Sequence, residues 1–361
     1  MKRLAILTGG GDAPGLNAVI RAVVKTAETE FNYQVLGVRN GFDGFVQENG
    51  IFPLDSLAVR GILPRGGTIL GAANRGNPFA LKMIAEDGTV SYQDTSQMVL
   101  ERIEELKLDA LIVVGGDGTL HIAQKLHEIG VPVLGVPKTI DNDIGGTDFS
   151  FGFDTAVATA TEAIDKLHTT AESHHRVMVL ELMGRDAGFI TLFAGIAGGA
   201  DVILIPEIPF NYENIFRKVS QRIKRKSYFS IVAVSEGASQ AGMEQVFLNQ
   251  GDKIYQSRLG GISHQVAEQI AKSCQVESRV TILGHLQRGG SPTPFDRWLA
   301  TRLGAEVVRA ASRNQTGMMS ALRGDSVIMV SLKEALAAPK RVNVNGNAVM
   351  TARNLGICLG D

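Results

Sequence analysis

The sequence is poor in the features that mark several special classes of protein. Two of its 361 residues are cysteines, Cys274 and Cys358, and they lack the spacing of a metal or redox site, which indicates a reducing compartment. The formal net charge is −1, so the chain has no general attraction for nucleic acid or membranes, and any anion must bind locally. No apolar run reaches membrane-spanning length, and the amino terminus lacks a signal-peptide cleavage pattern. We therefore expect a soluble, cytoplasmic protein.

Two common nucleotide-binding signatures are missing as well, although glycine is abundant. Neither a Walker A loop nor a G-x-G-x-x-G fingerprint follows the first apolar run, Leu4 to Leu7. The 41 glycines exceed the roughly 25 of average usage, and most of the excess lies in clusters after apolar runs. Gly9 to Gly11 precede a helical pattern from Leu16, so backbone N–H groups and a helix dipole are offered to an anion. A tight turn that needs positive φ explains this triplet about as well.

The stretch from Leu111 to Asp143 holds the densest group of candidate catalytic residues. An apolar run at 111–114 predicts a buried parallel strand, residues 115–118 form a glycine-rich turn, and a helical pattern begins near Thr119. A second apolar run at 131–136 leads into a polar loop from Lys138 to Asp143. Two strand ends delivered side by side would form the crevice in which open α/β sheets bind ligands.

The same strand–turn–helix pattern recurs along the chain and predicts the fold class. We expect an α/β protein of two doubly wound, Rossmann-like lobes with parallel sheets and the active site in the cleft between them. Ionisable side chains follow the predicted strands at Asp117, Asp141, Asp143, Arg185, Glu236, Arg279, His285 and Arg288. Because strand ends share one edge of a sheet, these residues can meet, and arginines with glycine turns suit a substrate pair that carries phosphate groups.

Single residues in this set suggest phosphoryl transfer. Asp117, among glycines, could hold Mg²⁺, which takes few carboxylates and keeps water and phosphate oxygens as its other ligands. Asp141 or Asp143 could accept a proton from an attacking hydroxyl. Local Asx capping would also explain aspartates in a TIDND turn, but the neighbouring GGDG turn favours a site. His174 and His175 have no metal-site companions, and a partly exposed entry to a strand explains them better.

Six motifs together resemble the bacterial type of 6-phosphofructokinase. They are GGGDAPGLNAVIR at 9–21, VGGDGT at 114–119, PKTIDNDI at 137–144, ELMGRDAG at 181–188, SEG at 235–237 and GHLQRGGSP at 284–292. They occur in the family's order over about residues 3 to 300 and are highly specific as a set. The GGDGT turn alone is shared with lipid kinases and NAD kinases.

The resemblance implies a role for each matching residue in phosphorylation of fructose 6-phosphate at its 1-hydroxyl by Mg-ATP. The implied catalytic residues are Asp141 as the base, Thr139, Asp143, Arg185 and Gly11. The implied ATP site contains Gly11, Asn74, Arg75, Gly116, Asp117, Gly118 and Thr119, with Asp117 holding Mg²⁺. The implied sugar-phosphate site contains Thr139, Ile140, Asp141, Arg176, Met183, Gly184, Arg185, Glu236, Arg279, His285 and Arg288.

The markers of the phosphoryl donor disagree, and the sequence is similar to the branch called mixed-substrate phosphofructokinases. Gly118 resembles ATP-using members, because a larger side chain there would intrude on the nucleotide phosphates, whereas Lys138 resembles pyrophosphate-using members. We give Gly118 more weight and keep a pyrophosphate-dependent enzyme as the alternative. Asn74 stands where relatives have an arginine that bridges both substrates, with Arg75 one place later. A non-catalytic sensor of nucleotides or sugar phosphates would have lost Asp117 or Asp141, and both are present.

The resemblance also implies a domain division and an oligomer. Residues 1–152 with about 287–340 would form an ATP-binding lobe, and 153–286 with about 341–361 a fructose 6-phosphate-binding lobe. Arg176 and Arg279 would reach the sugar phosphate of a neighbouring subunit, so that a homo-oligomer, expected to be a tetramer, completes the site. The match to the family's effector site is partial, because Arg21 and Lys25 fit it but His168 stands where an arginine is usual.

Overall fold

The structure is a computed structural model of the chain, and it describes all residues except 73–75, 85–88 and 250–257. The chain divides into two compact units, each of which collects distant segments of sequence. Unit 1 comprises Met1–Thr139, Asp143–Asp154 and Arg288–Pro339. Unit 2 comprises Ile140–Asn142, Thr155–Gln287 and Lys340–Asp361.

Unit 1 is built on a mixed, largely parallel sheet with the strand order β16-β15-β7-β6-β1-β2-β3. The five inner strands run parallel, whereas β3 and β16 pair antiparallel at the two edges. A short strand, β8, pairs with the end of β7. The strands are β1 (Arg3–Thr8), β2 (Gln34–Val38), β3 (Ile51–Leu54), β6 (Ala110–Gly115), β7 (Val133–Thr139), β8 (Phe151–Gly152), β15 (Met318–Arg323) and β16 (Ser326–Ser331).

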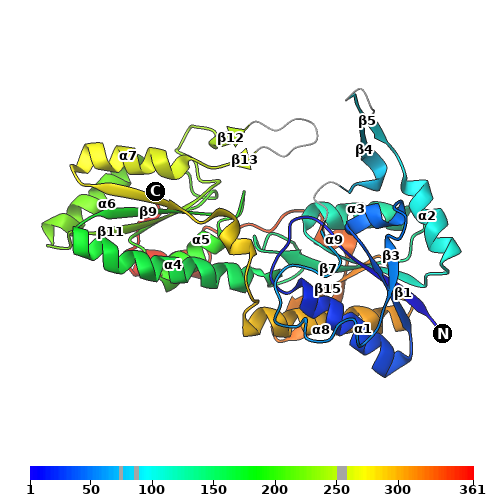
Figure 1. The fold of residues 1–361 in the computed structure, drawn as a ribbon. Coiled ribbons are helices and arrows are strands. Elements are labelled where there is room, and N and C mark those ends of the chain that lie inside the picture. Colours follow the sequence, from blue (N-terminus) through cyan, green and yellow to red (C-terminus); the bar gives the residue numbers. More distant parts are fainter. Residues whose placement is uncertain (73–75, 85–88, 250–257) are drawn as a thin grey trace. The chain divides into compact units, whose positions relative to one another are not determined.

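Helices cover both faces of this sheet (Figure 1). On one face, α1 (Leu16–Phe31) and α8 (Pro294–Ser312) pack over Leu4 and Ile6 of β1. On the other face, α2 (Ser96–Glu105) and α3 (Asp117–Glu128) pack over Ala5 and Leu7. Ala5 and Leu7 alternate with Leu4 and Ile6 along β1, so the two pairs point to opposite faces of the sheet. A sheet buried on both sides explains why β1 and β6 are continuous apolar runs. The remaining elements are η1 (Gly41–Phe45), η2 (Pro78–Ala80), the hairpin strands β4 (Leu81–Ile84) and β5 (Val90–Gln93), and α9 (Leu332–Ala335).

Unit 2 repeats the architecture with four parallel strands in the order β10-β11-β9-β14. One face of this sheet is covered by α6 (Tyr212–Lys224) and α7 (Ile262–Cys274), which enclose a core around Val179 and Val232. Its strands are β9 (Val177–Leu182), β10 (Val202–Leu204), β11 (Ser230–Ser235) and β14 (Ser278–Ile282). Its other elements are α4 (Phe153–His174), α5 (Phe189–Ala197), the strand pair β12 (Phe247–Asn249) and β13 (Arg258–Leu259), η3 (Gly284–Arg288) and α10 (Asn347–Asn354).

The predicted α/β class with doubly wound sheets is confirmed, and two local predictions need correction. Lys138 and Thr139 belong to β7 rather than to a loop, because Phe151 and Gly152 of β8 extend the ladder alongside them. Helix α3 begins at Asp117 rather than near Thr119, so Gly118 is helical and not part of a turn. No helix among the described residues is long and apolar enough to cross a bilayer.

Candidate functional site

In unit 1, the loops that follow β1 and β6 meet around a single buried side chain, Thr119. The N–H of Gly9 donates to the carbonyl of Val114 at 2.9 Å, which ties the two strand ends together. A Cβ atom at Gly9 would lie 2.6 Å from Thr119 Cγ2, and one at Gly115 would lie 2.4 Å from Thr119 Cβ. These glycines are therefore required by close packing, and Thr119, a predicted donor-site residue, fills the space between the loops.

Lys138 lies beside the glycine loop that follows β1. Its side chain is buried, and its Nζ donates a hydrogen bond to the carbonyl oxygen of Gly11. A Cβ atom at Gly10 would lie 3.5 Å from the same nitrogen. The cationic group is thus held at the carboxyl edge of the sheet, within the loop that the sequence predicts to receive donor phosphates.

Arg288 lies against the same loop in unit 1. Its Nη1 donates to the carbonyl of Asp12 at 3.2 Å and would lie 3.0 Å from a Cβ atom at Gly11. The sequence predicts Arg288 as a sugar-phosphate ligand, and the structure brings its guanidinium next to the predicted donor loop. Any side chain at position 11 would therefore displace this arginine.

The first turn of α3 presents an accessible carboxylate and an open glycine. The Asp117 side chain is about half exposed, at 45%, and His121 Nδ1 lies 3.4 Å from its Oδ1. Gly118 is exposed, and a Cβ atom added there would meet no atom of the described residues within 4 Å. Neither φ nor packing requires glycine at position 118, in contrast to positions 9 and 115.

The donor residues fit a weakly coordinated divalent cation better than a dedicated protein cage. Among the described residues, no group of three or more histidine, cysteine or acidic side chains is placed to hold a metal. Mg²⁺ is commonly bound through one or two carboxylates, with water and phosphate oxygens completing its octahedron. One accessible aspartate at a helix N-terminus beside glycine-rich loops matches that pattern.

A cavity of about 250 Å³ lies between the loop after β1 and a second loop at 64–72. It is lined by Gly10, Asp12, Gly67, Thr68 and Ala72. Asn74 and Arg75, which the sequence predicts at the donor site, lie outside the described residues. Three of the five lining residues, Gly10, Gly67 and Ala72, are small, which suits close approach by a phosphate chain.

In unit 2, the loop that follows β9 is fastened to the end of β11. The N–H of Arg185 donates to Glu236 Oε1 at 3.1 Å, and the N–H of Glu236 donates to the carbonyl of Leu182 at 2.8 Å. Gly184 has φ 140° and Arg185 has φ 50°, so the chain turns sharply here. A Cβ atom at Gly237 would lie 1.9 Å from the Arg185 carbonyl, which fixes glycine as the neighbour of Glu236.

Glu236 has a strongly perturbed carboxyl group. The pKa of Glu236 is raised to about 7, chiefly by burial and in addition by the charges of Asp141 and Glu181, against the lowering effect of hydrogen bonds from the Arg185 and Gly184 N–H groups. The charge interaction places Asp141, which is itself buried, near Glu236 within unit 2. Two acids predicted from separate motifs, PKTIDNDI and SEG, therefore act on one another electrostatically.

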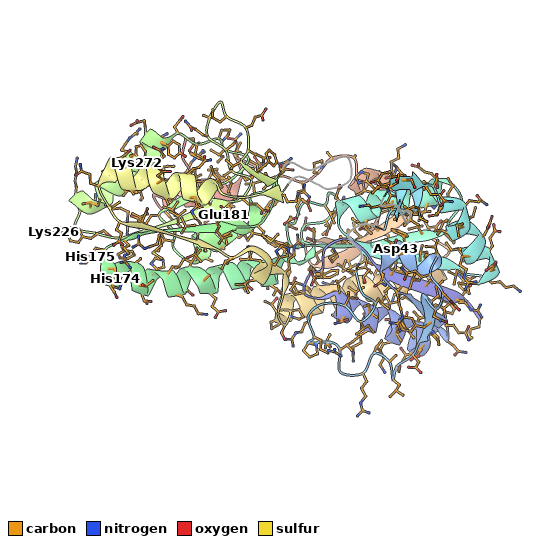
Figure 2. All side chains as sticks on the ribbon, turned by 45° about the horizontal axis from the view of Figure 1, so that its top comes forward. Asp43, His174, His175, Glu181, Lys226 and Lys272 are labelled. Atoms are coloured by element: carbon orange, nitrogen blue, oxygen red, sulfur yellow. The ribbon has the colours of Figure 1, made fainter. Side chains whose placement is uncertain are left out.

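Glu181 is a structural residue of this region that the sequence reasoning missed. It is buried on β9 below α7 (Figure 2), and its Oε2 accepts from the N–H groups of Gly261 at 3.2 Å and Ser263 at 3.1 Å. Its own carbonyl accepts from the N–H of Leu283 at 3.2 Å, just before the turn that carries His285. An acidic residue inside an apolar strand was the available signal, because such charges are seldom buried without donors.

The two arginines predicted to act across a subunit interface share one carboxylate. Arg176 Nε donates to Glu277 Oε2 at 2.8 Å, and Arg279 Nη2 donates to Glu277 Oε1. The hydrogen bond from Arg176 is the largest of the effects that lower the pKa of Glu277. His174 and His175 lie close by in the sequence at the end of α4 (Figure 2), and His175 packs edge-on against Tyr228 with ring centroids 5.6 Å apart. His285, in contrast, is exposed in η3.

Comparison with known proteins shows the family to which the chain belongs. A family model described as phosphofructokinase matches residues 3–311. The chain belongs to the phosphofructokinase family. It is 52% identical over 360 residues, 100% of this chain and 98% of the relative, to a protein of Chloroflexus aurantiacus named ATP-dependent 6-phosphofructokinase.

Phosphofructokinases that resemble the chain differ in the donor their names give. The chain is 48% identical over 343 residues, 94% of its length and 96% of the relative, to a Streptomyces coelicolor protein named pyrophosphate–fructose 6-phosphate 1-phosphotransferase. A crystal structure of Pichia pastoris phosphofructokinase in the T-state aligns with a TM-score of 0.80 and 28% identity over 98% of this chain. The chain spans 36% of the length of that larger protein.

Proposed function

We propose that this chain transfers the terminal phosphoryl group of Mg-ATP to the 1-hydroxyl of fructose 6-phosphate, giving fructose 1,6-bisphosphate and ADP. The observation that carries the choice of donor is the open space at Gly118, where neither backbone geometry nor packing against the described residues accounts for a glycine. Room for a nucleotide phosphate chain accounts for it. The extensive similarity to a relative named ATP-dependent supports the same donor.

Unit 1 supplies the donor site in this proposal. Gly11 brings its backbone to the ATP phosphates, Gly116 and Thr119 shape the floor of the site, and Asp117 holds Mg²⁺. The ion would neutralise charge on the phosphate oxygens during transfer. Asn74 and Arg75 are proposed to complete the nucleotide site.

Most of the proposed acceptor residues belong to unit 2, whereas Thr139, Asp143 and Arg288 belong to unit 1. Asp141 takes the proton from the attacking 1-hydroxyl, with Thr139 and Asp143 assisting on either side of it in the chain. Glu236, with a pKa of about 7, exchanges hydrogen bonds with sugar hydroxyls, because both its protonated and its charged forms are populated near neutral pH. The remaining proposed sugar-phosphate ligands are Ile140, Met183, Gly184, Arg185, His285 and Arg288.

Pyrophosphate is the alternative donor, and a specific observation favours it. Lys138 holds a buried amino group next to Gly11, where it could neutralise a small, highly charged donor. Turnover with Mg-ATP and with Mg-pyrophosphate at matched concentrations separates the two. We expect a higher kcat/KM with ATP, and turnover with pyrophosphate alone would overturn the donor assignment.

The role of Asp141 is tested by Asp141→Ala. We expect kcat to fall by about 10³-fold or more, because a positioned base acts in the transition state, while the calorimetric Kd for fructose 6-phosphate changes little. Asp186→Ala, on the same unit, serves as a control for removal of a nearby carboxylate. Near-normal turnover of the Asp141 variant would remove this residue from the role of base.

The active assembly is proposed to be a cytoplasmic homo-oligomer, a tetramer by the family resemblance. Arg176 and Arg279 lie together on Glu277 and would reach the sugar phosphate bound by a neighbouring subunit. Both guanidinium groups bond the Glu277 carboxylate, which supports the proposal that together they bind one phosphate group.

A further inference from the structure

The second wall of the cavity in unit 1 has no regular structure of its own. Residues 61–72 contain neither helix nor strand, yet Gly67, Thr68 and Ala72 line the space that faces Gly10 and Asp12. A loop without a backbone ladder depends on side chains to hold its position. The residues that fix this loop therefore determine the width of the cavity.

Asn17, in the first turn of α1, makes three hydrogen bonds that hold this loop. Its Nδ2 donates to the carbonyls of Arg65 at 3.1 Å and Gly66 at 3.2 Å, and its Oδ1 accepts from the N–H of Ile69 at 2.9 Å. The side chain is 2% exposed, so water does not compete for these groups. One amide thus holds three backbone groups across a span of five residues.

The same helix carries the other wall. The chain runs from the Gly9–Gly11 loop through Gly15, whose φ is 109°, directly into α1. Asn17 is the second residue of α1. Its hydrogen bonds therefore connect residues 65–69 to the helix that directly follows the Gly9–Gly11 loop. Thr8 reinforces the link, since its Oγ1 lies 3.0 Å from Thr68 Oγ1 and donates to the Gly71 carbonyl at 2.8 Å.

We propose that Asn17 is a positioning residue for the phosphoryl donor, because its buried amide sets the separation between the two loops that enclose the donor cavity. This inference about Asn17 rests on the proposed function, which identifies the donor as Mg-ATP. Without the amide, the loop shifts relative to Gly10 and Asp12, and a shift of about 1 Å is enough to impair a transfer that depends on alignment. Asn17 itself touches neither substrate.

The test compares Asn17→Ala with Asn214→Ala. Asn214 is a matched control in unit 2, where its Nδ2 donates to the Gly360 carbonyl at 3.0 Å and its Oδ1 accepts from Arg217 at 2.6 Å. For Asn17→Ala we expect the calorimetric Kd and the KM for Mg-ATP to rise about tenfold or more, while the Kd for fructose 6-phosphate stays within about twofold. Asn214→Ala should leave both dissociation constants unchanged even where it lowers the melting temperature.

Unchanged ATP binding in Asn17→Ala, or an equal loss for both substrates, would overturn the proposal. If Asn17→Ala does not fold, Asn17→Ser is used instead, because serine is smaller than asparagine but keeps one polar group. The calorimetric Kd of Asn17→Ser for Mg-ATP then tests the proposal by the same criteria. Failure of both variants to fold would assign Asn17 to the stability of α1 instead. Because calorimetry measures binding without turnover, a wild-type protein that binds ATP or pyrophosphate but does not phosphorylate fructose 6-phosphate would defeat the proposed function alone.

Discussion

Glu236 links the stability of unit 2 to pH. Its carboxyl has a pKa of about 7 in the folded chain, chiefly because of burial, against about 4.5 for the ordinary group. Between these values the folded state binds the proton more tightly than the unfolded state, so stability falls as pH rises from about 4.5 to above 7. The full difference corresponds to about 3 kcal/mol. We expect Glu236→Gln to remove this loss, so that the variant gains melting temperature relative to the parent as pH rises.

The comparison is made by calorimetry from pH 4.5 to 8.5, with Asp186→Asn as the control for replacing another carboxylate of unit 2 by its amide. A difference in melting temperature between Glu236→Gln and the parent that does not change with pH would show that Glu236 is already ionised in the folded protein at low pH.

Gly118 offers a test of donor choice that does not perturb the fold. A Cβ atom at this exposed position would meet nothing within 4 Å in the part of the chain that the structure describes, so we expect Gly118→Asp to retain its melting temperature. The new carboxylate would lie next to Asp117 and repel the ATP phosphates, and we expect kcat/KM for ATP to fall about 100-fold. Gly118→Ala separates the effect of size from that of charge. Unimpaired use of ATP by the aspartate variant would mean that the nucleotide does not pass this residue.

The sequence predicted residues at strand ends because polar groups there interrupt apolar runs. It did not predict Asn17 or Glu181, although each is a polar residue within an apolar helix or strand and so carried a signal. Their partners, Ile69 and Ser263, are distant in the sequence, and nothing local indicates which backbone groups a buried amide or carboxylate will reach. Hydrogen bonds of this kind become visible only when the fold is known.

At the scale of the elements, the contact between α1 and α8 allows the effect of close packing on stability to be compared with that of an exposed ion pair. A Cβ atom at Gly304 would lie 2.9 Å from the Val19 carbonyl and 3.0 Å from Ala22 Cβ, so the two helices approach closely at this glycine. We expect Gly304→Ala to destabilise unit 1 by roughly 1–2 kcal/mol, because overpacking outweighs the gain of up to about 1 kcal/mol in helix propensity. Urea unfolding followed by the fluorescence of Trp298, the single tryptophan, reports on α8 directly.

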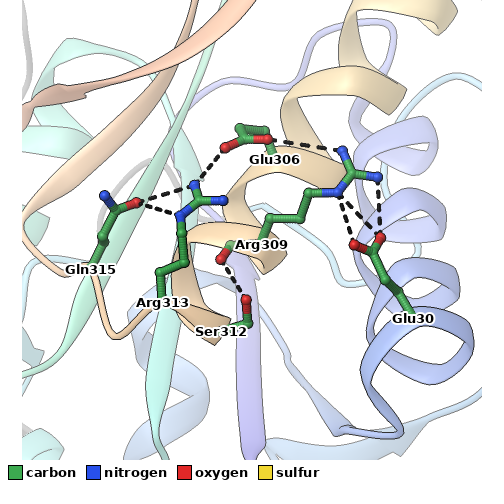
Figure 3. A network of polar contacts seen from close by, with 6 residues as sticks. All are labelled: Glu30, Glu306, Arg309, Ser312, Arg313 and Gln315. Carbon is green, nitrogen blue, oxygen red and sulfur yellow. Dashed lines mark hydrogen bonds and ion pairs between the residues drawn. The ribbon is translucent and has the colours of Figure 1, made fainter.

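The ion-pair network at the ends of the same helices is the control (Figure 3). Arg309 bonds both carboxylate oxygens of Glu30, yet these side chains are 44% and 41% exposed. Arg309→Ala should therefore change the unfolding free energy by less than about 1 kcal/mol. A larger effect for Arg309→Ala than for Gly304→Ala would reverse the ranking of packing above surface charge.

Most helices and parallel strands follow from apolar periodicity, and the exceptions have physical causes. The strand β7 extends through Lys138 and Thr139 because β8, only two residues long, pairs there, and such a short partner leaves no periodic signal. The edge strand β3 contains Pro53, a residue that argues against a strand unless it lies at an edge, as it does here. Pairing with distant segments decides both cases.

At the scale of the whole molecule, a site completed by a neighbouring subunit can be tested by mixing inactive variants. Asp141→Ala should remove the base from a subunit's own site, and Arg176→Ala with Arg279→Ala should remove the ligands it lends to its neighbour. In a symmetric interface each hybrid pair regains one intact site, so dissociating and reassociating an equal mixture should restore about a quarter of wild-type activity. The unmixed variants and a mixture that is not dissociated are the controls. If Arg176 and Arg279 served their own subunit's site, no hybrid would contain an intact site, and the mixture would stay as inactive as its parts.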